Sequence, residues 1–263
     1  MTAPQLTPAK LFNGKTLPAK WKEAQAAFIC FTPFPAGFEK YVTEISTERF
    51  FLHSPCTEVR LCTYNNISFI ILSEVYGFEV GSTTVEELIY YGIKNIIGIG
   101  YVGAFNGAPI GQKFIAKSAL SDLPLARHYG VEANEGVHPS IKFYSLIKSL
   151  GETDGTVWEE YSVWCTNSLY REYPATIKEM KEKGCSVVNM DTISVYAVAA
   201  LCAKEIGSEI NYIYVGTVTD SESDDGENWQ TDLIETITTD KKQPHDELSE
   251  YMVENVLSAI SQS

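Results

Sequence analysis

SVVNMDTISVYAVAAL, residues 186–201, is the segment that decides the fold of this chain. A β-rich apolar run precedes Met190-Asp191, and a small, alanine-rich run follows it. The change of hydrophobic period predicts a buried strand joined directly to a helix. Because that helix is apolar on nearly all faces, we expect it to lie in the interior of an α/β fold.

This junction places the carboxylate of Asp191 between two buried elements, where an unbound charge is costly. One interpretation is that Asp191 caps its own helix by accepting hydrogen bonds from free backbone N–H groups. The other is that it accepts hydrogen bonds from the hydroxyls of a ligand. Spacing alone favours the cap.

Composition and charge narrow the class of protein. The chain has 263 residues, of which 44% are hydrophobic, which indicates one globular domain over residues 1–263 with an irregular arm at 1–24. The net charge of −14 argues against nucleic-acid and anionic-membrane partners, which attract basic surfaces. No Cys-x-x-Cys pair or histidine spacing indicates a metal site. With no signal peptide and no apolar run long enough to span a bilayer, we expect a cytoplasmic protein.

Hydrophobic periodicity and turn residues predict the order of the elements. Strands are expected at 26–31, 58–63, 67–73, 95–100, 113–116, 155–164 and 209–217, with the second and third forming a hairpin around Asn65-Asn66. Helices are expected at 38–47, 85–91, 139–150, 172–183 and 245–260, and the helix at 139–150 should turn Ile141 inward.

Motifs along the chain resemble those of the nucleoside phosphorylase and nucleosidase superfamily and occur in the same order. They are the Gly-rich turn and Val-Glu-Glu-Leu helix at 77–89, Gly-Gln-Lys-Phe-Ile-Ala at 111–116, Asn-Ser-Leu-Tyr-Arg-Glu at 167–172, Val-Val-Asn-Met-Asp at 187–191 and Val-Thr-Asp at 218–220. The resemblance implies a three-layer α/β/α sandwich around a mixed sheet. It also implies a homo-oligomer (dimer, trimer or hexamer) that acts on a small nucleoside-like ligand without a bound cofactor.

The resemblance assigns the sugar site to the segment at residues 186–201. In the family the methionine of this motif packs under the ribose and a following glutamate takes the sugar hydroxyls. Met190 then corresponds to the ribose floor and Asp191 to the hydroxyl acceptor, one methylene shorter than glutamate. Asn189 stands where the family has its first glutamate. Ligands in such sheets bind at the carboxyl ends of strands, so we expect Asp220 also to lie just past a strand end.

The base site is implied by two other motifs. Tyr170 corresponds to an aromatic residue that lies against the base, with Asn167 and Arg171 in the same loop; strand-rich aromatics also pack in cores, and both interpretations stay open. Asp220 corresponds to an aspartate at purine N7. A purine leaves poorly as an anion, so an acid that protonates it assists the cleavage. Asp224, Asp225 and Glu227 are interpreted as a solvated acidic loop.

The phosphate site departs from the family. Its Arg-x-Gly-Thr-x-Gly-Ala motif reads Gly98-Ile-Gly-Tyr101-Val-Gly103-Ala here, so the phosphate-binding Arg and Thr are replaced by Gly98 and Tyr101. We still expect Tyr101 and Gly103 to contact the ligand. The nucleosidase pattern is also incomplete, because Gly216 stands at its arginine.

Three functions therefore remain. Phosphorolysis of a purine-type nucleoside, with inorganic phosphate as co-substrate, is slightly preferred because it is the commonest activity of the family. Hydrolysis with water as nucleophile is the second. The third is a ligand-binding or repurposed member of the fold without ordinary turnover.

Overall fold

The computed structural model describes residues 4–105, 107–121, 124–132, 135–222, 229–230 and 244–261. The acidic residues Asp224, Asp225 and Glu227 lie outside the described residues. Within the described part of the chain, no helix is long and apolar enough to cross a membrane.

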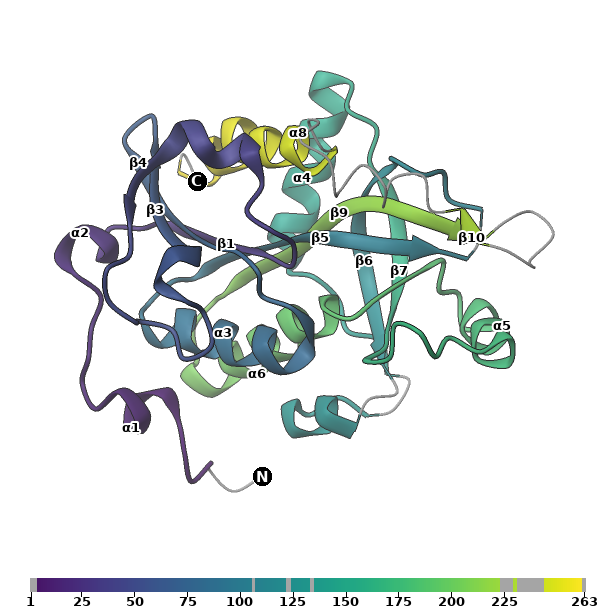
Figure 1. Ribbon diagram of the computed structural model, residues 1–263, viewed down its shortest axis with the longest axis horizontal. Helices are drawn as coiled ribbons and strands as arrows, with labels where there is room; N and C mark the ends of the chain where they lie inside the picture. The colour runs from purple at the N-terminus through teal and green to yellow at the C-terminus, as the bar shows by residue number, and fades with distance from the viewer. Residues whose placement is uncertain are drawn as a thin grey trace.

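A mixed sheet forms the middle layer of the molecule (Figure 1). In chain order its described strands are β1 (Ala26–Cys30), β2 (Val42–Ile45), β3 (Val59–Tyr64), β4 (Ile67–Leu72), β5 (Asn95–Ala104), β6 (Lys113–Ser121), β7 (Glu159–Cys165), β8 (Val187–Asn189), β9 (Asn211–Glu222) and β10 (Trp229–Gln230). Their spatial order is β10-β9-β6-β7-β8-β5-β1-β4-β3-β2, and β9 also pairs with β5. This extra pairing closes β5, β9, β6, β7 and β8 into a ring.

Helices cover both faces of this sheet, as Figure 1 shows. One face carries α3 (Gly77–Tyr90) and α6 (Thr192–Ile206), and the other carries α4 (Ile141–Asp154) and the C-terminal elements α8 (Pro244–Tyr251), η4 (Met252–Leu257) and α9 (Ser258–Ile260). A large apolar cluster lies on each side, the first including Val195 and Leu88 and the second including Phe143 and Met252. The remaining described helices are α1 (Pro8–Phe12), α2 (Ala19–Lys22), α5 (Pro174–Glu182) and the 3₁₀ segments η1 (Ala36–Tyr41), η2 (Cys56–Glu58) and η3 (Pro124–Tyr129). The predicted three-layer α/β/α architecture is confirmed.

The expected hairpin is also confirmed, and its turn explains it. Strands β3 and β4 are antiparallel and pair from Val59 with Leu72 to Tyr64 with Ile67. The two residues between them, Asn65 and Asn66, have φ of 48° and 63°. Two positive φ angles are what a two-residue hairpin loop requires, and asparagine tolerates them better than most residues.

Three local predictions were wrong. Residues 38–47 form the end of η1 and then strand β2, because Val42 and Ile45 pair with β3 instead of continuing a helix. Ile141 begins α4 and is 84% exposed, since the first turn of this helix does not yet lie against the sheet. Asp220 lies inside β9, which is extended to Glu222 by its pairing with β5 and β10.

Strands β5 and β9 approach each other closely because glycine lies on both. Gly100 and Gly216 are partners in the parallel register. A Cβ built on Gly216 would lie 2.2 Å from the carbonyl oxygen of Gly100 and 2.8 Å from the Phe114 ring. The arginine that the nucleosidase pattern places at 216 therefore has no room in this fold.

We predict that Gly216→Ala lowers the free energy of unfolding by about 3 kcal/mol, because the added methyl group meets backbone that cannot move aside. Gly136→Ala is the matched control, since a Cβ there has no neighbour nearer than 3.9 Å. Urea denaturation of both variants measures the difference. Equal midpoints for the two would show that β5 and β9 can separate without cost.

Candidate functional site

Two adjoining cavities lie where β5, β8 and β9 meet, and we call them the larger and the smaller lobe of the cleft. Their volumes are about 490 and 170 Å³. Residues that line both lobes are Gly103, Leu169, Val188, Asn189, Met190 and Asp220. The larger lobe adds Thr166, Tyr170, Glu172 and Trp229, and the smaller lobe adds Tyr76, Gly77, Tyr101, Val102, Asp191 and Thr219. Asp191 and Asp220 thus share one cavity.

The register of the ring of strands builds this cleft. Gly103 on β5 pairs with Val188 on β8 and with Asp220 on β9. A Cβ on Gly103 would lie 2.8 Å from Oδ2 of Asp220 and 3.2 Å from the ring of Trp229. The glycine therefore leaves the space that the Asp220 carboxyl group occupies.

The Asp191 side chain bonds the start of α3 and not its own helix α6, which sequence spacing alone favours. It stands at the N-cap of α6, yet its side chain makes no capping hydrogen bond. Its Oδ1 instead accepts a hydrogen bond of 2.8 Å from the backbone N–H of Gly77, at the start of α3. Gly77 has φ of 79°, a conformation that other residues rarely adopt. The simple cap interpretation was wrong.

Asn189 supplies the cap that Asp191 does not. Its Oδ1 accepts hydrogen bonds from the backbone N–H groups of Asp191 and Thr192 at 3.2 and 3.3 Å. Its Nδ2 donates to the hydroxyl of Thr192 at 2.9 Å. Asn189 lines both lobes as expected for a contact residue, but most of its amide group is engaged in shaping the turn.

Buried carboxyl groups give the cleft its chemical character. Burial raises the pKa of Asp191 to about 7, against the smaller effect of the Gly77 hydrogen bond. Burial also raises the pKa of Asp220, which accepts a hydrogen bond of 2.7 Å from the hydroxyl of Thr219. Burial and the nearby Asp220 raise the pKa of Glu172 to about 7. Carboxyl groups that keep a proton near neutral pH can act as acids.

The loop at 165–172 contributes differently from the prediction. Tyr170 is 86% exposed and lines the larger lobe, so it is not a core residue. Asn167 and Arg171 are exposed and do not line either lobe. The Arg171 guanidinium donates to the carbonyl oxygen of Tyr170 at 2.9 Å, and Asn167 accepts from Ser168 at 3.4 Å. Neither of these two predicted contact residues is brought to the cleft.

Glu172 lines the larger lobe, although it was not among the predicted contact residues. It follows Tyr170 and Arg171 in the same loop, and the sequence alone gives no sign which of the three faces inward. Tyr76 and Trp229, which also line the cleft, carried no sequence signal, because each comes from a segment outside the matched motifs.

Cations are absent from the described residues that line the two lobes. A Cβ on Gly98 would lie 2.7 Å from the ring of Tyr214 and 3.4 Å from that of Phe31, so aromatic rings fill the space beside the expected arginine position. Arg60 lies 3.9 Å from the ring centroid of Phe34 and pairs with Glu58.

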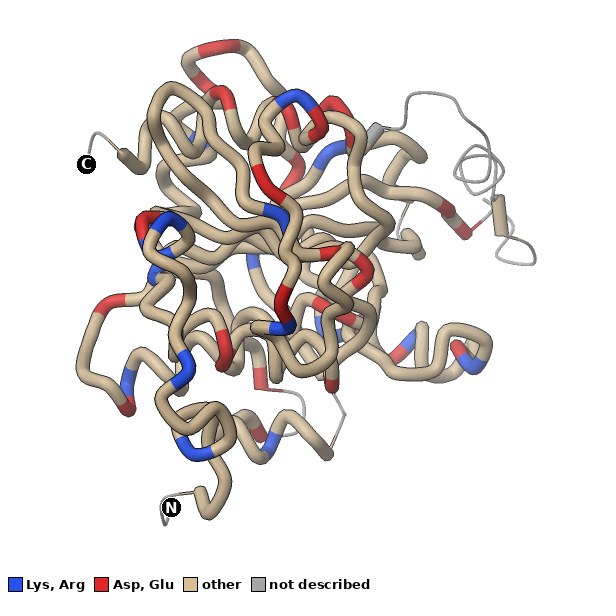
Figure 2. Tube along the Cα trace, turned by 60° about the vertical axis from the view of Figure 1, so that its left-hand side comes forward, with Lys and Arg blue, Asp and Glu red and all other residues tan. Residues whose placement is uncertain are grey.

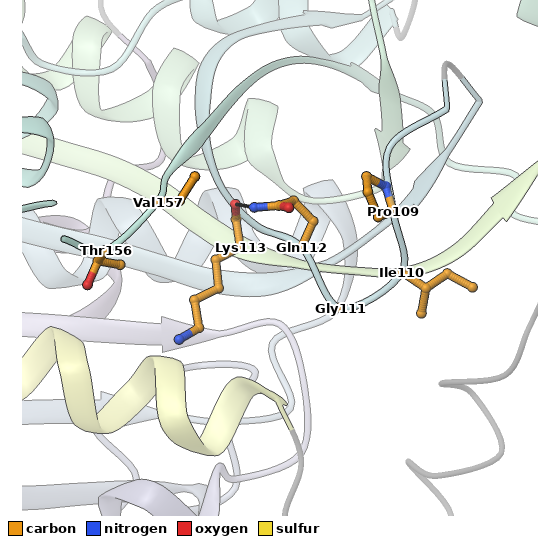
Figure 3. A pocket seen from close by; sticks show the side chains of 7 residues that line it. All are labelled: Pro109, Ile110, Gly111, Gln112, Lys113, Thr156 and Val157. Carbon is orange, nitrogen blue, oxygen red and sulfur yellow. Dashed lines mark hydrogen bonds between the residues drawn. The ribbon is translucent and has the colours of Figure 1, made fainter.

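Other basic residues lie elsewhere on the molecule. Lys113 lines a separate pocket beside Pro109, Gln112 and Val157, where its side chain extends away from that of Gln112 (Figure 3). In the view of Figure 2, Lys and Arg are scattered among Asp and Glu along the trace rather than gathered in one patch. Within the described part of the chain, no group of three or more His, Cys, Asp or Glu side chains is placed to hold a metal ion.

Tyr101 lines the smaller lobe, as expected for a contact residue. Its hydroxyl group hydrogen-bonds Nδ1 of His245, which begins the C-terminal helix α8. Met190 lies between Asn189 and Asp191 and lines both lobes. The cleft therefore combines an apolar floor, three protonatable carboxyl groups and a tyrosine hydroxyl.

Comparison with known proteins gives the same fold. Residues 26–252 match a family model described as the phosphorylase superfamily. The chain is 37% identical over 240 residues to an uncharacterised protein of Acanthamoeba polyphaga mimivirus, covering 90% of this chain and 91% of that protein. It is 25% identical over 143 residues to a DeoD-type purine nucleoside phosphorylase of Chromobacterium violaceum, covering 52% and 59%. A futalosine hydrolase mutant of Helicobacter pylori superposes with a TM-score of 0.64 at 12% identity, covering 91% of this chain and 100% of that chain.

We predict that Asp191→Asn becomes more stable relative to the unsubstituted protein as pH rises from 5 to 8. A pKa raised from 3.8 to about 7 means that the folded state keeps a proton which the unfolded state loses between these values. The free energy of unfolding of the unsubstituted protein then falls by about 3 kcal/mol as pH rises from 5 to 8, because only the interval from pH 5 to the folded pKa contributes. The amide of the variant does not titrate.

Urea denaturation at several pH values measures this difference. Glu87→Gln is the positive control, because burial also raises the pKa of Glu87 to about 7. The Glu87 carboxylate accepts a hydrogen bond from the backbone N–H of Leu52 and lies outside the cleft. A difference between Asp191→Asn and the unsubstituted protein that stays constant with pH would contradict a buried, protonated Asp191.

Proposed function

Because the chain belongs to the phosphorylase superfamily, we propose that it cleaves the N-glycosidic bond of a purine nucleoside by hydrolysis in the cleft between β5, β8 and β9. The superfamily supports cleavage of nucleosides in general, and the choice of water and of a purine is the proposal.

One observation carries the choice of water. The described lining of the cleft holds Asp191, Glu172 and Asp220 and no Lys or Arg. Phosphate dianions bind where guanidinium or ammonium groups offset their charge. Beside three carboxyl groups and no cation, a phosphate ion finds no positive charge to offset its own, whereas a neutral water molecule needs none.

The proposed roles follow the two lobes. Asp220, with its raised pKa, donates a proton to N7 of the leaving base, so that the base departs neutral. Asp191 accepts hydrogen bonds from the sugar hydroxyls, and Met190 lies beneath the sugar. Glu172 is a second protonatable carboxyl group facing the base, and Tyr170 covers the base from the exposed side.

A purine is favoured by chemistry and by similarity. The acid at Asp220 assists a base that has a basic nitrogen in the same ring as the glycosidic nitrogen, as a purine has at N7. The relative from Chromobacterium violaceum is named as a purine nucleoside phosphorylase. The larger lobe, at about 490 Å³, is in the usual range for small-molecule sites.

Phosphorolysis is the second candidate, and the name of that same relative favours it. It requires a phosphate-binding cation from outside the described lining. The two candidates therefore differ in a single measurable requirement, which is inorganic phosphate.

We predict that the purified protein releases free base from inosine, adenosine or guanosine in phosphate-free buffer, with one ribose per base. Added phosphate should change the rate by less than twofold. Chromatography of base and sugar products measures both, and uridine tests the preference for purines. Release that depends on phosphate, with ribose 1-phosphate as product, would favour the second candidate, and no release under either condition would contradict both.

We predict that Asp220→Asn lowers kcat for base release by about 100-fold or more, the usual contribution of a general acid. The rate of the unsubstituted protein should fall as pH rises through the raised pKa of this group. Asp154→Asn is the matched control, because Asp154 is exposed at the end of α4, bonds Tyr251 and lines neither lobe. If Asp220→Asn keeps the rate of the control, Asp220 is not the acid.

A further inference from the structure

Tyr101 lines the smaller lobe of the cleft and is hydrogen-bonded to His245, and the proposed cleavage has so far given neither residue a role. The Tyr101 hydroxyl hydrogen-bonds Nδ1 of His245, and the two rings meet edge to face with centroids 5.1 Å apart. His245 is only 5% exposed, and its Nε2 lies 3.8 Å from Oδ1 of Asp246. A hydroxyl, an imidazole and a carboxylate thus form a chain that leads away from the cleft.

Close packing of α8 on η1 fixes this chain of groups. Oδ1 of Asp246 accepts a hydrogen bond of 2.7 Å from the backbone N–H of Ala36. A Cβ on Gly37 would lie 2.1 Å from the carbonyl oxygen of Asp246, so only glycine permits this approach. His245 is therefore held against β5 by contacts that do not involve the cleft.

The direction of the hydrogen bond follows from the charges around the imidazole. Burial lowers the pKa of His245 despite the nearby Asp246, so the ring is neutral at neutral pH. The carboxylate beside Nε2 favours a proton on that nitrogen, which leaves Nδ1 as an acceptor. Tyr101 then donates to Nδ1, and its oxygen keeps lone pairs that can accept a hydrogen bond from a molecule in the smaller lobe.

The position of Tyr101 suits a nucleophilic water. Tyr101 and Gly103 are two residues apart on β5, so they face the same side about 7 Å apart along the strand. Gly103 lies beside Asp220, the proposed donor to the base, and Asp191 lines the same lobe. A sugar bound in this lobe then has its leaving base beside Asp220 and the Tyr101 side chain on the same face of β5.

We propose that Tyr101 and His245 together form the base that activates the attacking water. This inference rests on the proposed hydrolysis. As the water oxygen bonds to C1′ of the sugar, its proton passes to the Tyr101 oxygen, and the Tyr101 proton passes to Nδ1 of His245. The C1′–N bond breaks, its electron pair leaves with the base, and the base takes the proton of Asp220. His245 ends as an imidazolium beside the Asp246 carboxylate and Asp220 ends as a carboxylate. Before the next turnover His245 returns its proton to solvent and Asp220 takes one from solvent.

The test compares Tyr101→Phe and His245→Gln with the unsubstituted protein, using inosine in phosphate-free buffer. Each variant should lose about 100-fold in kcat with KM changed less than threefold, since a general base acts in the transition state. Tyr144→Phe is the matched control, because it also removes a tyrosine hydroxyl that bonds a side chain, here the carboxylate of Glu160, and it lies outside the cleft. Circular dichroism checks that each variant is folded. If His245→Gln does not fold, the kinetics of Tyr101→Phe alone decide the test.

Azide distinguishes a chemical role of Tyr101 from a merely structural one. As an anion that attacks without losing a proton, it should restore base release by Tyr101→Phe at least tenfold, forming a glycosyl azide. It should not restore release by Asp220→Asn, which lacks the acid.

The pH–rate profile of the unsubstituted protein should lose activity at low pH as His245 gains a proton, and this limb should be absent in His245→Gln. The groups that face the pair are Asp246, Tyr76 and Cys30.

The outcomes separate this inference from the function on which it rests. Base release by the unsubstituted protein, with both variants within threefold of it, would overturn the role of the pair and leave hydrolysis standing. A loss of rate that azide does not restore would also overturn it. No base release by the unsubstituted protein would overturn the hydrolysis and this inference together.

Discussion

The close contact between β5 and β9 is the constraint on which the site depends. Gly100 and Gly216 meet with no room for a side chain, and a register shift after Val102 then brings Gly103 beside Asp220. The same strands, paired with β6 and β8, close the ring whose edge opens into the cleft. A carboxyl group from β9 is thus held against bare backbone on β5, where burial favours its protonated form.

A cleft lined by carboxyl groups and no described cation is suited to some ligands and not to others. Burial raises the pKa of Asp191 and of Glu172 to about 7, so both can hold a proton near neutral pH. Such groups can accept hydrogen bonds from hydroxyls or donate a proton to a leaving base. They supply no positive charge to offset a phosphate dianion, which is the reason for proposing water as the nucleophile.

The departures from the superfamily pattern have a common physical origin in packing. The rings of Tyr214 and Phe31 fill the space beside Gly98, where the pattern has arginine. Tyr101, in place of a small hydroxyl residue, reaches across to His245 on α8. The chain therefore replaces a set of charged phosphate contacts with aromatic packing and a buried hydrogen-bonded pair.

The sequence by itself determined the layers, the central strand–helix junction and the motif order, because hydrophobic period and glycine positions are local properties. It also pointed to Met190, Asp191 and Asp220, which the fold brings to one cleft. Only the tertiary structure decided that Glu172 and not Arg171 turns inward, that Asn189 rather than Asp191 caps α6, and that His245 stands behind Tyr101. These features depend on contacts between segments far apart in the chain, which no local pattern records.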